Sequence, residues 1–497
     1  MRNAQGTQDA QNVRGECGSR DVQSARDVTT PQDTPSTQNA QKLGFVLAIY
    51  LVGLAVGGLY VGMVAPVRTV IQAHFGLDDA TGIWMINIYT LFYAALIPVI
   101  GKLADRYGRK PIFVLCVTFF GLGAALCGLS RWCGGFVLLL AGRVAQAVGA
   151  CGMIPVANAE IGTSFPAEKR GMALGLAAAV AGLANVLGAA VGSLILGVIG
   201  NENWPWLFFG CIPLCILLLV GGMLFLQSTK RASAGRLDIA GSVFFVAAIL
   251  FLLLGIRNLD FLNLAGTVTA VSCWGPLVGA VLCIVIFRFI ERRAEDPIFH
   301  MEYLHVRPIF ITMAVSFFIG CAMISMTIVP EFAEAVMDAR TGSGGYYVAA
   351  LSVFSLVGPV VAGKLIDRGG PKRVLIAGLA LMVVGFAFLG TVAIAYPSAL
   401  TLIAGLSVVG LGMGFSMGAP TNYMILQNVP SEESTSAVAT IALVRQIGTS
   451  IAPAIYVGFI SNAAGLGGYQ QMMAAVAICC ACGIALMLFY REPQGKR

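Results

Sequence analysis

The stretch of sequence that decides the fold is Gly101-Lys102-Leu103-Ala104-Asp105-Arg106-Tyr107-Gly108-Arg109-Lys110-Pro111, a short polar run between two long apolar segments. It carries four basic residues and a single carboxylate. Its glycines permit tight backbone geometry, and Asp105 can accept charge-assisted hydrogen bonds from a neighbouring arginine or from a helix terminus. Basic residues in so short a loop are typical of the cytoplasmic side of a membrane protein.

A near copy of this stretch, Gly363-Lys364-Leu365-Ile366-Asp367-Arg368-Gly369-Gly370-Pro371-Lys372-Arg373, begins 262 residues later (363 − 101). Basic residues that only set the membrane topology would not need an Asp-Arg pair at the same position in both runs. The second copy therefore indicates an internal repeat, as in transporters that are built from two related halves.

These two runs resemble the signature loop of the major facilitator superfamily, which joins helices 2 and 3 in each half of those transporters. The second copy keeps Asp367 and Arg368 but departs from the motif with Gly369 and Pro371. The resemblance implies an all-α integral membrane protein with two six-helix bundles around a central cavity, which works by alternating access as the bundles rock. The first copy matches the motif at Gly101, Asp105, Arg106, Gly108, Arg109 and Lys110.

The composition also indicates a membrane protein. Of the 497 residues, 58% are hydrophobic and 11% are charged, and the mean hydropathy is +0.84, whereas a soluble protein has about 25% charged residues. The net charge of +7 comes from cations scattered through short loops, which favours positive-inside topology over nucleic-acid binding. The thirteen cysteines show no metal-ligand spacing and no hydrolase or kinase motif occurs, so we expect neither a cofactor nor enzyme activity.

Apolar runs of membrane-spanning length alternate with short polar breaks from Leu43 onward. Two directly joined six-helix halves would place their signature loops about 200 residues apart, so the observed 262 leaves room for two extra helices, which we assign to 238–257 and 268–289. The fourteen predicted helices are 43–65, 82–101, 112–130, 134–158, 171–194, 205–226, 238–257, 268–289, 308–330, 344–363, 374–395, 399–424, 437–460 and 468–490.

The predicted organisation has five parts. Residues 1–41 are polar and form a disordered cytoplasmic tail, without the apolar segment of a signal peptide. The first six-helix bundle covers 42–228, the two inserted helices lie in 229–290, a cytoplasmic loop connects them over 291–307, and the second bundle covers 308–497. We expect a monomer.

The distribution of basic residues predicts the orientation. With a cytoplasmic N-terminus, the inner loops and the C-terminal end hold twenty lysines and arginines, and the outer loops hold four. This bias predicts a multi-pass protein of the plasma membrane with both termini in the cytoplasm.

Two arginines are predicted to lie at membrane depth. Arg143, in the predicted helix 134–158, is about nine residues from the outer end, too deep to reach the interface easily. Its surroundings resemble the helix-4 motif of the superfamily, whose arginine is implicated in proton transfer in drug antiporters. Arg445, in 437–460, begins a run that resembles an Arg-Gln-Leu-Gly motif of the same branch. Two buried cations can suit an anionic substrate, or each can be neutralised by helix C-terminal carbonyls or loop acids.

Glu160 lies at the end of the helix that contains Arg143. The junction from Pro155 to Gly171 resembles the helix 4–5 junction of the fourteen-helix drug:proton antiporter branch. The carboxylate can pair with the cations of the first signature loop and lock one conformation, or it can be a solvated helix-end group. The sequence allows both.

The chain departs from that branch in two places. Ala184-Asn185 stands where those antiporters usually have a Gly-Pro element, and Gly57 stands where many carry an Asp, nine residues before Pro66 (66 − 57). No Asp or Glu lies near the middle of any predicted helix, so a proton carrier would have to be an acid at a helix end. The candidates are Asp105, Glu160, Asp238 and Glu331.

The resemblance implies proton-coupled efflux of hydrophobic drugs or toxic compounds, with a small-molecule substrate, protons and the lipid bilayer as partners. The main alternative is a carrier of a metabolite or an organic anion, which the two arginines suggest, and the third is a membrane sensor that transports nothing. Arg143, Glu160 and Arg445 are the candidates for proton coupling or for the electrostatics of a cavity. The predicted conformational latch comprises Gly101, Asp105, Arg106, Gly108, Arg109, Lys110, Glu160, Asp367 and Arg368.

Overall fold

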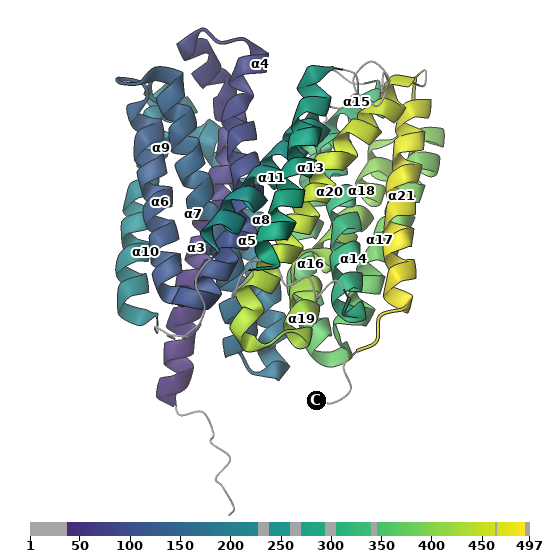
Figure 1. The fold of residues 1–497 in the computed structure, drawn as a ribbon. Coiled ribbons are helices and arrows are strands. Elements are labelled where there is room, and N and C mark those ends of the chain that lie inside the picture. The colour runs from purple at the N-terminus through teal and green to yellow at the C-terminus, as the bar shows by residue number, and fades with distance from the viewer. Residues whose placement is uncertain are drawn as a thin grey trace, which may run out of the picture. The chain divides into compact units, whose positions relative to one another are not determined.

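The computed structural model describes residues 37–226, 238–258, 270–293, 305–338, 345–462 and 465–492. The chain divides into two compact units, Met1–Phe45 and Val46–Arg497, and the description below concerns the second. All its described elements are helices (Figure 1). Most of the predicted tail 1–41 lies outside the described residues, although the first helix already begins at Thr37.

The first group of helices, purple to blue in Figure 1, follows the order predicted for the N-terminal bundle. α3 continues past Pro66, so the prediction that this helix ends near residue 65 is wrong. A proline inside a helix removes one hydrogen bond, which bends a helix without having to end it. The group comprises α3 (Thr37–Phe75), α4 (Asp79–Gly82), α5 (Trp84–Tyr107), α6 (Arg109–Leu129), α7 (Gly135–Ser164), α8 (Ala167–Ile199), α9 (Pro205–Phe209) and α10 (Cys211–Phe225).

The inserted helices and the second group complete the fold. The predicted helix 399–424 is interrupted at Gly418, whose φ of 70° does not fit a right-handed helix, so two helices form there. The inserted pair is α11 (Ile239–Arg257) and α13 (Val271–Glu291). The second group comprises α14 (Arg307–Met323), α15 (Val329–Met337), α16 (Gly345–Gly369), α17 (Pro371–Ala395), α18 (Ala399–Ser416), α19 (Ala419–Asn428), α20 (Ser434–Asn462) and α21 (Gly467–Leu488).

Thirteen helical segments in the described part of the chain are long and apolar enough to cross a membrane. They coincide with thirteen of the fourteen predicted helices, and the remaining prediction, 344–363, coincides with α16. The first signature loop joins α5 to α6 and the second joins α16 to α17. We call the end of the helices that carries these two loops the signature-loop end, and the opposite end the far end.

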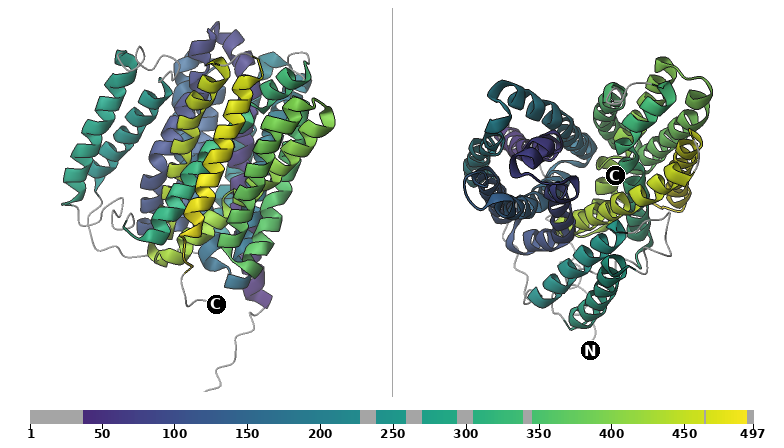
Figure 2. Two further views of the ribbon diagram at one scale, coloured as in Figure 1. Left: turned by 90° about the vertical axis from the view of Figure 1, so that its right-hand side faces the viewer. Right: turned by 90° about the horizontal axis from the view of Figure 1, so that it is seen from above.

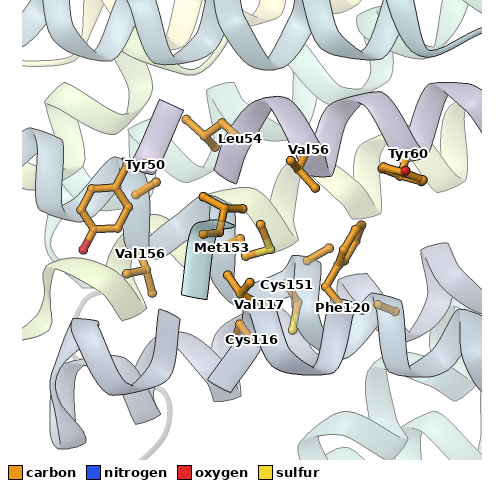
Figure 3. Packing of buried hydrophobic residues seen from close by; sticks show 14 of the residues in the cluster. Tyr50, Leu54, Val56, Tyr60, Cys116, Val117, Phe120, Cys151, Met153 and Val156 are labelled. Atoms are coloured by element: carbon orange, nitrogen blue, oxygen red, sulfur yellow. The ribbon is translucent and has the colours of Figure 1, made fainter. Parts of the chain in front are cut away.

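The interior of each bundle is filled by large apolar side chains. In the N-terminal bundle α3, α6 and α7 pack together, and Figure 3 shows Tyr50 and Leu54 facing Met153 and Val156. The rings of Tyr50 and Phe113 meet edge to face at 5.0 Å, an arrangement that aromatic pairs prefer. A second cluster fills the C-terminal bundle between α14, α17, α18 and α21. Each group of helices therefore has a buried apolar interior, and the first cluster continues onto helices of the second group at Ala362, Ile366 and Ala439.

The inserted helices lie outside both bundles. Figure 2 shows the teal pair α11 and α13 on one side of the two groups when the helices are viewed from above. Ile249 and Leu253 of α11 form a small buried cluster with Leu91 of α5 and Leu443 of α20. Because α5 and α20 belong to different bundles, α11 covers the line along which the bundles meet on this side.

All five tryptophans of the chain lie at the far end. Trp84 begins α5, Trp132 lies in the turn between α6 and α7, and Trp274 lies in the first turn of α13. Trp204 and Trp206 lie where α9 begins. Four of the five are exposed and Trp204 is buried. Tryptophan is enriched where a membrane meets water, so this arrangement fits a boundary of the bilayer at the far end.

Candidate functional site

Asp105, in the last turn of α5, joins the two bundles. Its Oδ1 accepts a hydrogen bond from the backbone N–H of Thr435 at 3.0 Å, and its Oδ2 accepts bonds from the backbone N–H and the hydroxyl of Ser436, both at 2.7 Å. These N–H groups lie in the first turn of α20, where the helix itself offers them no acceptor. The positive end of the helix dipole favours a carboxylate there. Asp105 thus caps a helix of the opposite bundle.

Asp367 makes the matching contact in the second copy of the loop. Its Oδ1 accepts from the backbone N–H of Gly171 at 2.7 Å, and its Oδ2 accepts from that of Met172 at 2.9 Å. Both donors lie near the start of α8, in the N-terminal bundle. Each of the two aspartates therefore crosses to a helix of the opposite bundle, as two related halves would require.

Glycines in each loop permit this close approach. A Cβ atom on Gly101 would lie 2.7 Å from a side-chain carbon of α20, and a Cβ atom on Gly363 would lie 2.5 Å from the carbonyl oxygen of Gly171. At the turns, Gly108 and Gly370 have φ values of 96° and 83°, which other residues rarely adopt. The repeated glycines thus serve helix contact and turn geometry at equivalent places in the two halves.

Arg109, buried at the first position of α6, connects three helices. Its Nη1 donates to Oε2 of Glu160 and to the Thr163 hydroxyl of α7, both at 2.6 Å. On the other side, Nη2 donates to the Ser434 hydroxyl and Nε donates to the Thr435 hydroxyl at 3.3 Å. The planar fork of the guanidinium allows these bonds to form together. One side chain thus ties the end of α7 to the start of α20 in the other bundle.

The second copy cannot repeat this network. Pro371 is the counterpart of Arg109 (371 − 109 = 262) and has neither a guanidinium nor a backbone N–H. The first loop therefore joins the bundles through an aspartate and an arginine, and the second loop does so through its aspartate.

Each signature loop is also tied to the last helix of its own bundle. Lys110 donates from Nζ to the carbonyl oxygen of Met223 at 2.7 Å, near the end of α10. Lys372, its counterpart, donates to the carbonyl oxygen of Tyr490 at 2.6 Å, just after α21. A lysine at a helix C-terminus satisfies free carbonyls and favours the negative end of the dipole.

The partners of the loops include residues that the sequence did not single out. Arg106 lies over the ring of Tyr107, 5.6 Å from its centroid, and Arg368 is exposed. The hydroxyl partners in α7 and α20 are neutral. The predicted helix 437–460 begins three residues after Ser434, so it leaves out the first turn of α20. The run Ser-Glu-Glu-Ser-Thr-Ser over 431–436 is a helix-start signal that could have identified them.

Arg143 lies inside the N-terminal bundle and is 2% exposed. Its Nε donates to the carbonyl oxygen of Met85 at 3.0 Å and its Nη1 donates to Oε1 of Gln146 at 2.8 Å. The guanidinium carbon lies 4.3 Å from the centroid of the Tyr89 ring, which is a cation–π contact. All three partners are neutral. Glu160, seventeen residues further along α7 (160 − 143), is about 25 Å away along the helix axis.

Arg445 lies in α20 and is half-buried. It follows Leu443, which packs against Leu91 of α5, so this part of α20 lies beside the part of α5 that holds Tyr93. Among the described residues the Arg445 side chain has neither a hydrogen bond nor an ion pair. Tyr93 and Tyr89 are one helical turn apart on α5 with their rings stacked, 6.0 Å between centroids and 9° between planes. We call Arg143, Tyr89, Tyr93 and Arg445 the arginine–tyrosine ladder. It runs from the N-terminal bundle to the C-terminal bundle.

The structure has the features of a membrane transporter built from two halves. Aspartates cap helices across the halves, an arginine joins the halves, and two copies of one loop begin 262 residues apart. A model of the Major Facilitator Superfamily matches residues 50–453 and 345–497, and the chain belongs to this family. The predicted all-helical facilitator fold is confirmed. Members of this family are transporters and not enzymes. In the described residues no group of three His, Cys, Asp or Glu side chains is placed to hold a metal ion.

Several bacterial proteins are similar to the chain along most of its length. An uncharacterized MFS-type transporter of Bacillus subtilis, YfiU, is 33% identical over 88% of this chain and 82% of its own. The multidrug transporter protein MdtP of the same species is 27% identical over 80% and 70%. The riboflavin transporter RibZ of Clostridioides difficile is 25% identical over 84% and 88%.

Solved structures agree with this assignment at the level of the fold. A double-tryptophan mutant of XylE has a TM-score of 0.69 at 14% sequence identity, over 92% of this chain and 97% of that one. At this identity the likeness concerns the fold alone, and it supports the arrangement of two helical bundles described above.

Proposed function

We propose that the protein is a secondary transporter that exports hydrophobic compounds by alternating access in exchange for protons. The observation that carries the proposal is the pair of aspartates, Asp105 and Asp367, each of which caps a helix of the opposite bundle. Such bonds can break and re-form as two bundles rock, because they join helix ends without covalent links or interlocked side chains. The export of drugs is supported by the names of relatives such as MdtP.

In this proposal the signature-loop end of the structure is closed. Asp105 and Arg109 hold α5, α6 and α7 to the start of α20, and Asp367 holds α16 to the start of α8. Opening this end requires both sets of bonds to break. The residues of the predicted latch would therefore set the balance between two conformations and would not bind substrate.

Glu160 is the acid that we propose for proton coupling. It is paired with Arg109 at 2.6 Å and its side chain is 21% exposed, so water can reach it. A proton on Glu160 would remove the ion pair and free Arg109 to leave the hydroxyls of α20. Arg143 cannot carry the proton, because arginine stays charged in proteins. Protonation and opening of the signature-loop end would thus be linked through one guanidinium.

The test is pH-gradient-driven uptake into everted membrane vesicles, after counterflow with a substrate panel has identified a substrate. We expect Glu160→Gln to lose the response to the gradient and Arg143→Ala to keep it, even if its rate falls. Full proton coupling in Glu160→Gln would place the carrier elsewhere and would favour the second candidate, a carrier of a metabolite or an organic anion. The two arginines at membrane depth are the observation that supports that candidate.

A further inference from the structure

Two arginines at membrane depth, Arg143 and Arg445, have no carboxylate partner in the part of the chain that the structure describes. The described partners of Arg143 are a carbonyl, an amide and a ring, and Arg445 has neither a hydrogen bond nor an ion pair among the described residues. Glu160, on the helix of Arg143, pairs with Arg109, and Asp105, on the helix of Tyr93, caps α20, twelve residues from Tyr93 (105 − 93), or about 18 Å along α5. Glu433, directly before α20, is twelve residues from Arg445 (445 − 433), or about 18 Å along the helix.

Helix dipoles do not neutralise these charges either. Met85, whose carbonyl accepts from Arg143, is in the first turn of α5, the positive end of that helix. Arg445 is the twelfth of the 29 residues of α20, far from its C-terminal carbonyls. A buried cation is costly unless an anion compensates it. The compensating anion is therefore expected from outside the chain.

The residues between the two arginines indicate the shape of that anion. The stacked rings of Tyr89 and Tyr93 present flat apolar surface, and a further aromatic ring would add to such a stack. Tyr93 and Arg445 are half-buried, and no described residue accepts a bond from the Tyr93 hydroxyl. Deeper in, the amide nitrogen of Gln146 is fully buried without an acceptor, beside the guanidinium of Arg143. Each of these unfilled donors suits a carboxylate.

We propose that the arginine–tyrosine ladder is the substrate subsite and that it takes a planar aromatic carboxylate. Arg445 and Tyr93 meet the ligand first, and Arg143 with Tyr89 forms the buried base of the subsite. The inference rests on the proposed transport function and, of its two candidate substrate classes, favours the organic anion. It has a consequence for drug export, because a hydrophobic cation would be repelled by the ladder.

The decisive comparison uses three probes with one ring system: a naphthalene carboxylate, the matching carboxamide and the matching naphthylmethylammonium. Binding is measured by titration calorimetry on the purified full-length chain in lipid nanodiscs. We expect the carboxylate to bind at least about tenfold more tightly than the amide, which corresponds to about 1.4 kcal/mol, and the cation to bind most weakly. Equal binding of carboxylate and amide, or preference for the cation, overturns the proposal without any variant.

Variants then assign the effect to residues. Arg445→Gln should bring the carboxylate and the amide within about twofold of each other, and Arg445→Lys should keep part of the difference. Tyr93→Leu should weaken both probes alike, because stacking does not depend on the charge. Arg307→Gln removes a cation at the start of α14, outside the ladder, and serves as the control. A carboxylate preference that survives in folded Arg445→Gln contradicts the assignment.

Measuring transport as well as binding distinguishes a failure of the subsite proposal from a failure of the proposed transport function. If the carboxylate binds with the expected preference but shows no counterflow in proteoliposomes, the subsite stands and the transport proposal fails. If cations show rapid counterflow that Arg445→Gln does not change, the chain is a transporter and the subsite proposal is wrong.

Discussion

Arg109 in the first signature loop is replaced by Pro371 in the second, and this one difference has a large physical effect. Arg109 reaches both α7 and α20 through separate nitrogens, and Pro371 has no group that could do so. The two loops therefore share one device, the capping aspartate, and only the first adds a charged bridge. We expect the first loop to control the opening of the signature-loop end more strongly than the second.

The aspartates test this order. Asp105→Asn should lower the transport rate about tenfold or more and leave substrate binding within several-fold. The reason is that the amide nitrogen of asparagine cannot accept the two hydrogen bonds from Ser436. Hydrogen bonds to a charged group contribute about 1.5–3 kcal/mol. Asp367→Asn should cost less, since Asp367 accepts two bonds where Asp105 accepts three. Counterflow at matched expression compares them. Equal losses, or unchanged transport in folded Asp105→Asn, would contradict this prediction.

Arg109→Lys keeps the charge but not the fork. A single ammonium cannot serve Glu160 and the hydroxyls of α20 at once, so the first turn of α20 should open more often. We expect amide hydrogen exchange over 431–436 to become about tenfold faster, since loss of about 1.4 kcal/mol changes an equilibrium tenfold. Lys110→Arg is the control, because its bond to the Met223 carbonyl needs only one donor. Unchanged exchange in Arg109→Lys would show that the bridge does not hold the bundles.

Among the helices, α8 and α16 of the two bundles approach each other backbone against backbone. Gly363 of α16 lies against Gly171 of α8, whereas an added Cβ at Gly369 would meet nothing within 4 Å. Substituting alanine at each glycine therefore distinguishes two effects: loss of the contact between helices, expected only at Gly363, and the higher helix propensity of alanine, expected at both. On the other side of the bundles, α11 covers the contact between α5 and α20 with apolar side chains.

Gly363→Ala should force α8 and α16 apart, at a cost of about 1–3 kcal/mol. We expect a lower midpoint of thermal unfolding and faster exchange of the Gly171 and Met172 amides, which now donate to Asp367. Gly369→Ala should leave both unchanged or slightly raise the midpoint, since alanine favours a helix by up to about 1 kcal/mol over glycine. The same loss in both variants would mean that the helix contact is not the cause.

Sequence patterns predicted where the helices lie better than they predicted how the helices contact one another. Apolar length alone located the helices, because a span needs about 20 apolar residues wherever it lies. The pattern could not show that α3 passes through Pro66, since later residues decide whether a proline ends a helix or bends it. Nor could it show that Gly418 divides α18 from α19. Both errors concern places where backbone geometry departs from the regular helix.

For the candidate site, the sequence identified charged groups and missed neutral ones. Asp105 and Arg109 could be found because charge is rare in this chain. Their partners in α20 are backbone N–H groups and hydroxyls more than three hundred residues away, which no local pattern connects to them. Tyr89 and Tyr93 follow the spacing of ordinary core residues, and only the fold places Tyr89 against Arg143 and brings this part of α5 beside α20.

At the scale of the whole molecule, the orientation in the membrane is a prediction that one native residue can test. Cys133 is exposed in the turn between α6 and α7 at the far end. Because the signature loops and the tail that holds Cys17 are predicted to be cytoplasmic, the test uses the Cys17→Ser protein. In it a membrane-impermeant maleimide should label Cys133 in intact cells and not in sealed everted vesicles. Cys133→Ser is the control and should abolish labelling from outside. Labelling only in everted vesicles would reverse the predicted topology.

The placement of the tryptophans has an optical consequence. Since all five lie at the far end, the intrinsic fluorescence of the unlabelled protein comes from one side of the membrane. Trp84 begins the helix that ends in the Asp105 cap, so a tilt of α5 would move an emitter at one end as the cap releases at the other. A change in emission on adding a ligand would therefore report the state of the far end without any introduced dye.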